Sequence, residues 1–118
     1  MKIAIVDDSR AVHAFLEDLF SGIAVLDHFY DGKQVIDFFQ NQTNNVDLIL
    51  LDWEMPIMTG IDSLPKLKLL TKAPIVMMTS KNNMSDISLA INNGASDYLM
   101  KPFTKEIMIE KVNSILNS

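Results

Sequence analysis

The sequence contains no cysteine and no long hydrophobic run. Without cysteine the chain can form neither a disulfide framework nor a thiolate metal site, and it suits a reducing compartment. Its N-terminal apolar run is far too short for a signal peptide, and no run approaches the roughly 18 apolar residues of a membrane span. We therefore expect a cytoplasmic protein that makes no membrane contact.

Basic residues are fewer than acidic ones, at 10 against 15, which gives a net charge of −5. They are also scattered, whereas a surface that binds nucleic acid needs lysine and arginine clustered on one face. We expect no direct contact with nucleic acid. In an acidic domain, any lysine close to carboxylates becomes a candidate for handling phosphate.

The length of 118 residues, with 48% hydrophobic and 21% charged residues, is typical of one globular domain. Strand and helix patterns alternate along it, which predicts an α/β fold with a parallel sheet covered by helices. Residues 24–29 alternate between apolar and polar more than the other predicted strands do, and they include Asp27 and His28. We therefore place this strand at a sheet edge. The predicted strands are 2–6, 24–29, 48–51, 75–78 and 98–100.

Capping residues and apolar stripes predict the helices. Ser9 and Thr104 are expected N-caps of the first and last helices. The third helix is expected from about 61 to 70, with Pro65 displacing its start or bending it. A fourth is expected over 84–92.

Polar residues close four of the predicted strands. Asp7 and Asp8 follow the first, Asp52 follows 48–51, Thr79 follows 75–78 and Lys101 follows 98–100. Because the carboxyl ends of parallel strands meet in one crevice, these five side chains are expected to share a pocket.

Three carboxylates in one pocket repel each other unless they share a cation, and oxygen ligands of this kind suit Mg²⁺. Taken alone, Asp7 and Asp8 could equally be a solvated pair at a helix start. Lys101 and Thr79 add ligands for phosphoryl oxygens. Asp52, in the middle of the group, is the candidate nucleophile toward phosphorus.

Four segments resemble one family, the receiver domain of two-component response regulators, and the chain is similar in size to the single-domain chemotaxis regulator. The resemblance implies a flavodoxin-like sheet in the order 2-1-3-4-5 with five helices on both faces, as a single receiver domain over residues 1–118. The matching segments are IVDDS at 5–9, LLDWEMPIMTG at 50–60, MMTS at 77–80 and GASDYLMKPF at 94–103.

The resemblance implies that Asp52 is the phosphoacceptor, receiving a phosphoryl group from a sensor histidine kinase, a phosphotransfer protein or a small donor such as acetyl phosphate. Asp8 and Asp52 would bind Mg²⁺ directly, or Mn²⁺ in its place. Asp7 would act mostly through water, and the backbone carbonyl of Glu54 would complete the protein ligands. Such a domain catalyses only its own phosphorylation and dephosphorylation.

The family also implies roles for Lys101, which would hold a phosphoryl oxygen, and for a cis peptide before Pro102. Thr79 and Tyr98 would form the switch pair. Thr79 would move toward the phosphoryl group, the ring of Tyr98 would turn inward, and the surface of the fourth helix, fifth strand and fifth helix would change.

Two positions that vary in the family carry opposite charges here, namely Glu54 and Lys81. We hypothesise that their side chains approach each other over the pocket, hinder the hydrolytic water and prolong the phosphoryl lifetime.

Two apolar residues fall outside the apolar stripes of their helices and could form a partner or dimer contact together with Tyr98. Leu89 lies away from the face made by Met84, Ile87 and Ile91, and Ile107 lies away from that of the last helix. In contrast, His13 and His28 lack ligand spacing, and we expect them at the surface or at a sheet edge.

Other functions remain open at this stage. A haloacid-dehalogenase-type phosphatase also uses an aspartate nucleophile and Mg²⁺, but needs a second aspartate where Glu54 stands. A flavin carrier would need hydroxyl and glycine residues after the first strand, which reads DDSRAV. A degenerate receiver acting as a scaffold would not need the full acidic, threonine and lysine set. The cognate kinase, the output partner and the natural extent of the protein cannot be read from the sequence.

Overall fold

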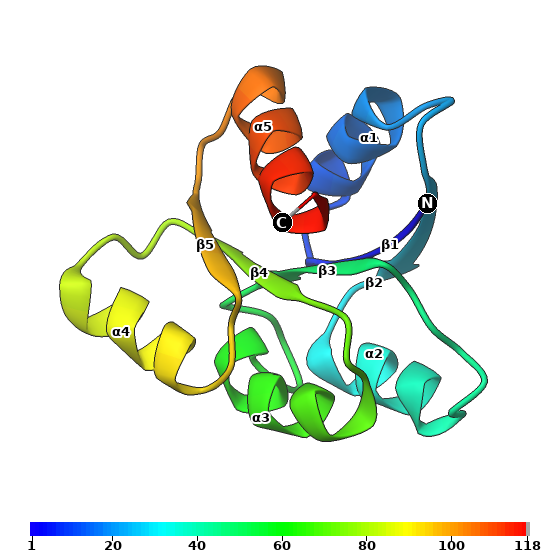
Figure 1. Cartoon of the computed structure of the whole chain (residues 1–118). Helices are drawn as coiled ribbons and strands as arrows, with labels where there is room; N and C mark the ends of the chain where they lie inside the picture. The colour runs from blue at the N-terminus through cyan, green and yellow to red at the C-terminus, as the bar shows by residue number, and fades with distance from the viewer. Residues whose placement is uncertain (118) are drawn as a thin grey trace.

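The computed structural model describes residues 1–117; Ser118, the last residue of the expected domain, lies outside that range. Within it, the strands form a parallel sheet in the order β2-β1-β3-β4-β5, the order implied by the family resemblance (Figure 1). The strands are β1 (Lys2–Val6), β2 (Val25–Phe29), β3 (Leu48–Asp52), β4 (Ile75–Thr79) and β5 (Asp97–Met100).

Helices cover both faces of the sheet, so that the molecule has three layers. In Figure 1 the first and last helices lie on one face and the other three on the opposite face. The helices are α1 (Arg10–Leu19), α2 (Gly32–Gln40), α3 (Gly60–Leu70), α4 (Met84–Asn92) and α5 (Lys105–Leu116). Within residues 1–117, none of these helices is long and apolar enough to cross a membrane.

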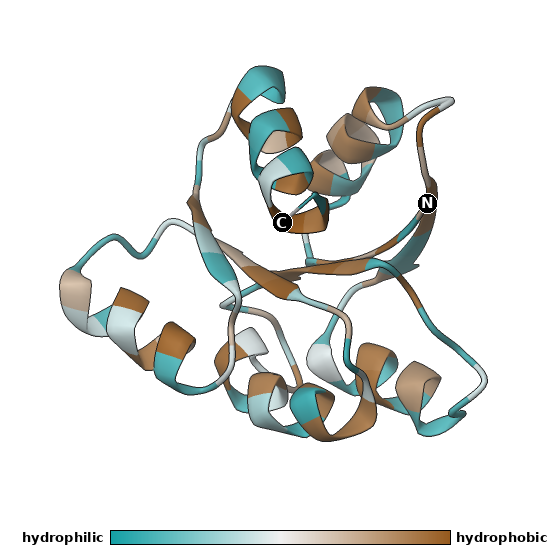
Figure 2. Ribbon diagram, viewed as in Figure 1, coloured by the Kyte–Doolittle hydropathy of each residue, from teal (hydrophilic) through white to brown (hydrophobic). Residues whose placement is uncertain are grey.

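Successive side chains of a strand point to opposite faces of the sheet, so the hydrophobic core has two parts. Ile3 and Ile5 of β1 pack with α1 and α5, whereas Ala4 and Val6 pack with α2 and α3. Both sets are fully buried, which explains why the central strands are uninterrupted hydrophobic runs (Figure 2). A sheet held from both sides keeps the carboxyl ends of its strands in fixed positions.

Helix starts are set by side-chain caps. Ser9 Oγ accepts a hydrogen bond from the Val12 N–H at 3.3 Å, and Thr104 Oγ1 accepts one from the Ile107 N–H at 3.1 Å. Both caps were expected. They start α1 and α5 directly after the segments that carry the acidic residues and Lys101.

The expectation for Pro65 needs correction. Helix α3 begins at Gly60 and runs through Pro65 without interruption. Thr59 caps it by accepting from the Asp62 N–H at 3.2 Å, so the helix is established before the chain reaches the proline. The proline then removes one interior hydrogen bond but does not set the start.

The apolar face assigned to α4 was also wrong. Met84 and Ile91 are exposed, at 73% and 44%, and Ala90 is the buried residue of this helix. Helix α4 flanks β5 at the edge of the sheet, where a small residue suffices for close packing. Met84, Leu89 and Ile91 are therefore left exposed, while Ile87 is half-buried.

Candidate active site

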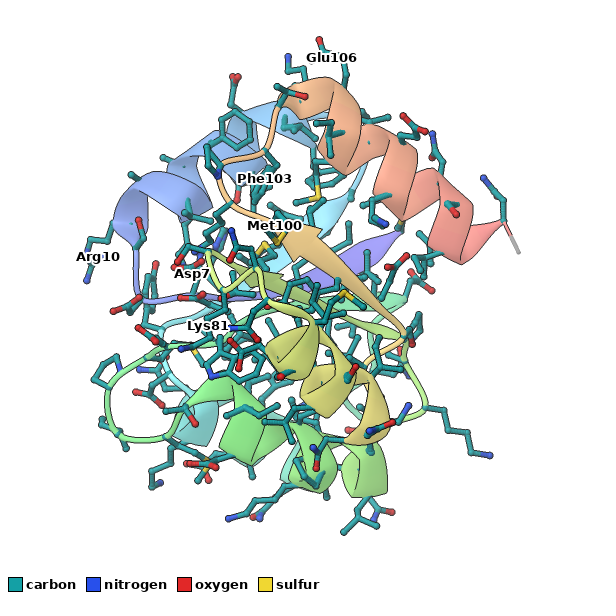
Figure 3. The ribbon with its side chains drawn as sticks, turned by 90° about the vertical axis from the view of Figure 1, so that its left-hand side faces the viewer. Asp7, Arg10, Lys81, Met100, Phe103 and Glu106 are labelled. Atoms are coloured by element: carbon teal, nitrogen blue, oxygen red, sulfur yellow. The ribbon has the colours of Figure 1, made fainter. Side chains whose placement is uncertain are left out.

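The polar residues expected at the strand ends come together at one edge of the sheet. Asp7 directly follows β1, Asp52 ends β3 and Thr79 ends β4. The carboxylates of Asp7, Asp8 and Asp52 each offer an oxygen within 4.8 Å of the others. Figure 3 shows Asp7 in this region, which the topology of a parallel sheet makes the natural place for a ligand.

Asp52 is 7% exposed, and neighbouring groups of both charge signs act on the pKa of its carboxyl. Burial raises the pKa of its carboxyl to about 6, the nearby charge of Asp7 adds to the effect, and Lys101 opposes it. The N–H of Trp53 donates to Asp52 Oδ1 at 2.9 Å and fixes the orientation of the carboxylate. The other oxygen, Oδ2, is left for a reaction partner.

Lys101 supplies the positive charge of the pocket. Its ammonium lies 2.7 Å from Asp7 Oδ2 and 3.4 Å from Asp52 Oδ1. Burial acts to lower the pKa of Lys101, but the two carboxylates outweigh burial and raise it. The peptide bond between Lys101 and Pro102 is cis.

The three carboxylates and one ammonium fit a divalent cation. Asp7 is fully buried and Asp52 nearly so, while Asp8 is exposed at the entrance. A single lysine cannot balance three carboxylates, and oxygen donors in this number suit Mg²⁺, which keeps several waters. Asp7, Asp8 and Asp52 would hold it. The backbone carbonyl of Glu54 stays a predicted ligand.

Gly60 shapes the loop that follows the candidate nucleophile, a role that the sequence reasoning missed. Its N–H donates to the Trp53 carbonyl at 2.7 Å and closes the loop from β3 to α3. A Cβ atom on residue 60 would lie 1.8 Å from the carbonyl oxygen of Asp52, so only glycine fits. Its place at the end of LLDWEMPIMTG was the available signal.

Thr79 and Tyr98 both bond to the main chain of Lys81. Thr79 Oγ1 accepts from the Lys81 N–H at 3.1 Å, and the Tyr98 hydroxyl donates to the Lys81 carbonyl at 2.5 Å. Thr79 is buried and Tyr98 half-buried, and burial raises the pKa of the Tyr98 phenol. The two residues are thus connected through one peptide segment.

The side chain of Lys81 reaches across the loop after β3. Its ammonium lies 3.0 Å from Glu54 Oε1 and 5.6 Å from the centre of the Trp53 ring. The hydrogen bond to Glu54 raises the pKa of Lys81. Figure 3 labels Lys81 on the loop that leads into α4. The ion pair therefore joins the two loops that follow β3 and β4.

The expected surface position of His13 was wrong. His13 is 4% exposed, and its Nδ1 lies 2.6 Å from Nδ1 of His28, which is half-buried on the edge strand β2 as predicted for that residue. Burial lowers the pKa of His13, and the neighbouring His28 contributes. A helical spacing of three residues between His13 and the core residue Leu16 could have indicated the buried face.

Leu89 and Ile107 are 46% and 47% exposed, on α4 and α5 respectively. Met84, Ile91 and Met100 are also exposed, so five large apolar side chains are exposed on α4, β5 and α5. We call these five residues the α4–β5–α5 patch. Its role in binding stays a prediction.

A second apolar feature borders the pocket itself. A groove of about 390 Å³ lies between α1 and the segment after β5. Phe15 of α1 is 40% exposed there, and its ring centre lies 6.0 Å from that of Phe103. The groove is lined by Ala11, Val12, Phe15, Lys101, Pro102 and Phe103, among others.

Comparison with known proteins gives a consistent result. A crystal structure of a two-component response regulator from Clostridium difficile has a TM-score of 0.91 and 31% identity, and covers 99% of this chain and 96% of that one. The chemotaxis protein CheY1 of Helicobacter pylori strain J99 is 26% identical over 123 residues, which is all of this chain and 98% of that protein.

The transcriptional regulatory protein CpxR of Escherichia coli K12 is 35% identical over 117 residues. That match covers 98% of this chain but 49% of CpxR, so the chain spans about half the length of that relative. The sequence model of the response regulator receiver domain matches residues 3–113. With the acidic pocket, Lys101 and the 2-1-3-4-5 sheet, this match shows that the chain belongs to the response regulator receiver domain family.

Proposed function

We propose that this receiver domain takes up a phosphoryl group on Asp52 from a sensor histidine kinase or a phosphotransfer protein. The observation that carries the proposal is the convergence of Asp52 with two further carboxylates and Lys101 at the strand ends. Receiver domains are signalling modules, so the only reaction proposed is the domain's own phosphorylation and its reversal.

The reaction uses a carboxylate oxygen of Asp52 as nucleophile. It attacks phosphorus, a P–O bond forms to Asp52, and the P–N bond to the donor histidine breaks as the imidazole leaves. Asp7, Asp8 and Asp52 would hold Mg²⁺, which would supply positive charge against the carboxylates and the phosphoryl group. Lys101, now bonded to Asp7, is close enough to Asp52 to donate to the incoming group.

A protein donor needs a place to dock beside Asp52. The groove that contains Phe15 and Phe103 is apolar and open, and Lys101 lies both in its wall and in the acidic pocket. We propose that the donor protein packs an apolar face here, which brings its phosphohistidine to Asp52. Small donors such as acetyl phosphate do not require this contact.

Signal output is proposed to pass through Thr79 and Tyr98. The new negative charge at Asp52 attracts the Thr79 hydroxyl, which now accepts from the Lys81 N–H. Because Tyr98 bonds to the carbonyl of the same residue, a shift of this segment alters the Tyr98 side chain and the α4–β5–α5 patch. The partner that binds this surface is an output protein or a second copy of the chain.

The ion pair between Glu54 and Lys81 is proposed to prolong the phosphorylated state. It joins the loops that follow β3 and β4, and a pair held between these loops would hinder a water that approaches Asp52. A phosphatase of the haloacid-dehalogenase type finds no support, because Glu54 occupies the position of its second aspartate and pairs with Lys81.

The test is to incubate the protein with acetyl phosphate and Mg²⁺ and to follow its intact mass. Wild type is expected to gain one phosphoryl group, and a sample treated with a chelator is not. Asp52→Asn removes the nucleophile and should remain unmodified. A phosphorylation level in Asp52→Asn equal to that of wild type would show that the acceptor lies elsewhere.

A further inference from the structure

The two histidines link the edge strand to the acidic pocket. His13 Nε2 lies 2.7 Å from the main-chain carbonyl oxygen of Asp7, and the Nδ1 atoms of His13 and His28 are 2.6 Å apart. His28 Nε2 in turn lies 2.6 Å from Glu17 Oε2. The result is an unbroken series of contacts from a surface carboxylate to the backbone of Asp7.

The chemistry of the two ends fixes the hydrogen-bond roles. A carbonyl oxygen can only accept, so His13 carries its proton on Nε2 and donates it to Asp7. Nδ1 of His13 is then an acceptor, and His28 Nδ1 must donate to it. The carboxylate of Glu17 lies against the other ring nitrogen of His28, Nε2, and so holds the His28 ring toward His13.

Neighbouring rings hold His13 in this orientation. The Tyr30 ring centre is 4.4 Å from that of His13, and the Arg10 guanidinium lies 5.0 Å from the centre of the Tyr30 ring. Figure 3 labels Arg10 near the start of α1, the helix that also carries His13 and Glu17. A buried ring with both nitrogens bonded has little freedom to turn away from Asp7.

Every polar group of Asp7 is engaged. Its N–H donates to the Phe29 carbonyl at 3.1 Å, and its carboxylate accepts from the Ser9 N–H at 2.8 Å and from Lys101 at 2.7 Å. Its carbonyl takes the His13 bond. Loss of that bond would leave a carbonyl without its partner in a fully buried residue and would free the peptide after Asp7 to rotate.

We propose that His13, oriented by His28 and Glu17, is a positioning residue for the metal site and acts by fixing the backbone at Asp7 and Asp8. The proposal rests on the proposed function, since it presumes that the acidic residues bind Mg²⁺. It goes beyond that function by assigning a part in metal binding to three residues outside the strand ends. Groups that orient metal ligands typically change affinity by about 10- to 100-fold when removed.

The decisive variants are His13→Gln, which keeps a side-chain N–H at a reach similar to that of histidine Nε2, and His13→Met, which has a similar length and no donor. Mg²⁺ binding can be followed by the fluorescence of Trp53, the only tryptophan, whose N–H bonds to Asp52. We expect His13→Met to bind Mg²⁺ about tenfold more weakly and His13→Gln to bind within about twofold of wild type. Urea unfolding of each variant confirms that it is folded.

A purely structural role for His13 would change stability and leave the Mg²⁺ affinity of the folded protein as it was. Wild-type affinity in folded His13→Met, or a loss in His13→Gln equal to that in His13→Met, overturns the proposal. Failure of the wild type itself to bind Mg²⁺ would instead contradict the proposed function. The two ideas are thus tested separately.

Histidine ¹⁵N spectra of the wild type provide a test that no folding defect can obscure. At neutral pH we expect the ring proton of His13 on Nε2. On Mg²⁺ titration, the Nε2 resonance of His13 should shift with the same midpoint as the Trp53 fluorescence. A proton on Nδ1 of His13, or a His13 resonance indifferent to bound Mg²⁺, overturns the proposal.

Discussion

The ammonium group of Lys101 lies closer to Asp7, at 2.7 Å, than to Asp52, at 3.4 Å. The lysine therefore neutralises a fully buried carboxylate that is not the proposed acceptor. When negative charge accumulates at Asp52, the shared ammonium can move by a short distance and serve both residues. We propose that Lys101 stabilises the fold before phosphorylation and binds the phosphoryl group during it.

This relationship predicts the effect of Lys101→Met. Removing one partner of a buried ion pair leaves the other charge uncompensated, which typically costs about 3–5 kcal/mol. Because Lys101 is 23% exposed, we expect a loss of about 3 kcal/mol in the free energy of unfolding, measured with urea at neutral pH in a chelator. Lys33→Met, which breaks the exposed pair with Asp37, is the control and should change stability far less than Lys101→Met. Equal effects of the two substitutions would argue against a buried pair.

The raised pKa of Asp52 predicts a pH-dependent effect of Asp52→Asn. The folded state holds the proton up to a pH of about 6, against 3.8 for an ordinary aspartate, so between these values it binds more protons than the unfolded state. Stability is therefore lost as the pH rises through this window. Asparagine stays neutral and avoids the loss.

At about pH 7, in a chelator, Asp52→Asn should exceed wild type by about 2–3 kcal/mol in the free energy of unfolding, the equivalent of roughly two pKa units. The two proteins should converge below a pH of about 4. A constant difference across the whole range would rule out Asp52 as its source.

Gly60→Ala is expected to lower the free energy of unfolding far more than Gly22→Ala, a substitution at an exposed glycine. The added methyl would overlap the Asp52 carbonyl at 1.8 Å, so the loop or the end of β3 must move. We expect a loss of more than about 3 kcal/mol and impaired phosphorylation. Gly22→Ala adds a methyl at a positive φ of 75° but in open space, and should cost only about 1–2 kcal/mol. Comparable losses in both would show that strain, and not overlap, is responsible.

Glu54→Ala and Lys81→Ala are expected to shorten the phosphoryl lifetime. An exposed ion pair has a modest effect, so we expect the hydrolysis rate to rise by at most about fivefold. Phosphate release after removal of the donor provides the measurement, and both substitutions should have similar effects because each breaks the same pair. Unchanged lifetimes in both variants would refute the role.

The α4–β5–α5 patch predicts an effect on association. The double substitution Leu89→Ser, Ile107→Ser should leave stability within about 0.5 kcal/mol, since both side chains are exposed, but should abolish any shift to a dimer that phosphorylation produces on a sizing column. Leu69→Ser, at a leucine that is 89% exposed on α3, is the matched control and should behave as wild type. Dimerisation of the double variant at the wild-type level would count against this surface.

Much of the site could be predicted from the sequence because its residues lie where the strands end. Fully buried strands are continuous apolar runs, and the first polar residue after each run, such as Asp7 or Lys101, marks where the strand leaves the core. The order of the strands could not be derived this way and came from the family resemblance. Packing between neighbouring elements is invisible to a one-dimensional pattern.

The errors follow from the same limit. The approach of His13 to His28 depends on how α1 lies against β2, which no spacing between residues 15 apart in the chain reveals. On α4, the stripe through Met84 and Ile91 had the period of a buried face, yet the helix packs through Ala90 at the edge of the sheet. Periodicity shows which residues share a face and does not show whether another element covers it.

The main chain of Lys81 accepts from one member of the expected switch pair and donates to the other, so Thr79 and Tyr98 cannot rearrange independently of it. Thermodynamic linkage makes such a connection work in both directions. If phosphorylation changes the affinity for an output partner by some factor, the bound partner changes the equilibrium constant of phosphorylation by the same factor. The amount of output protein in the cell would then help set how much of the regulator is charged with phosphate.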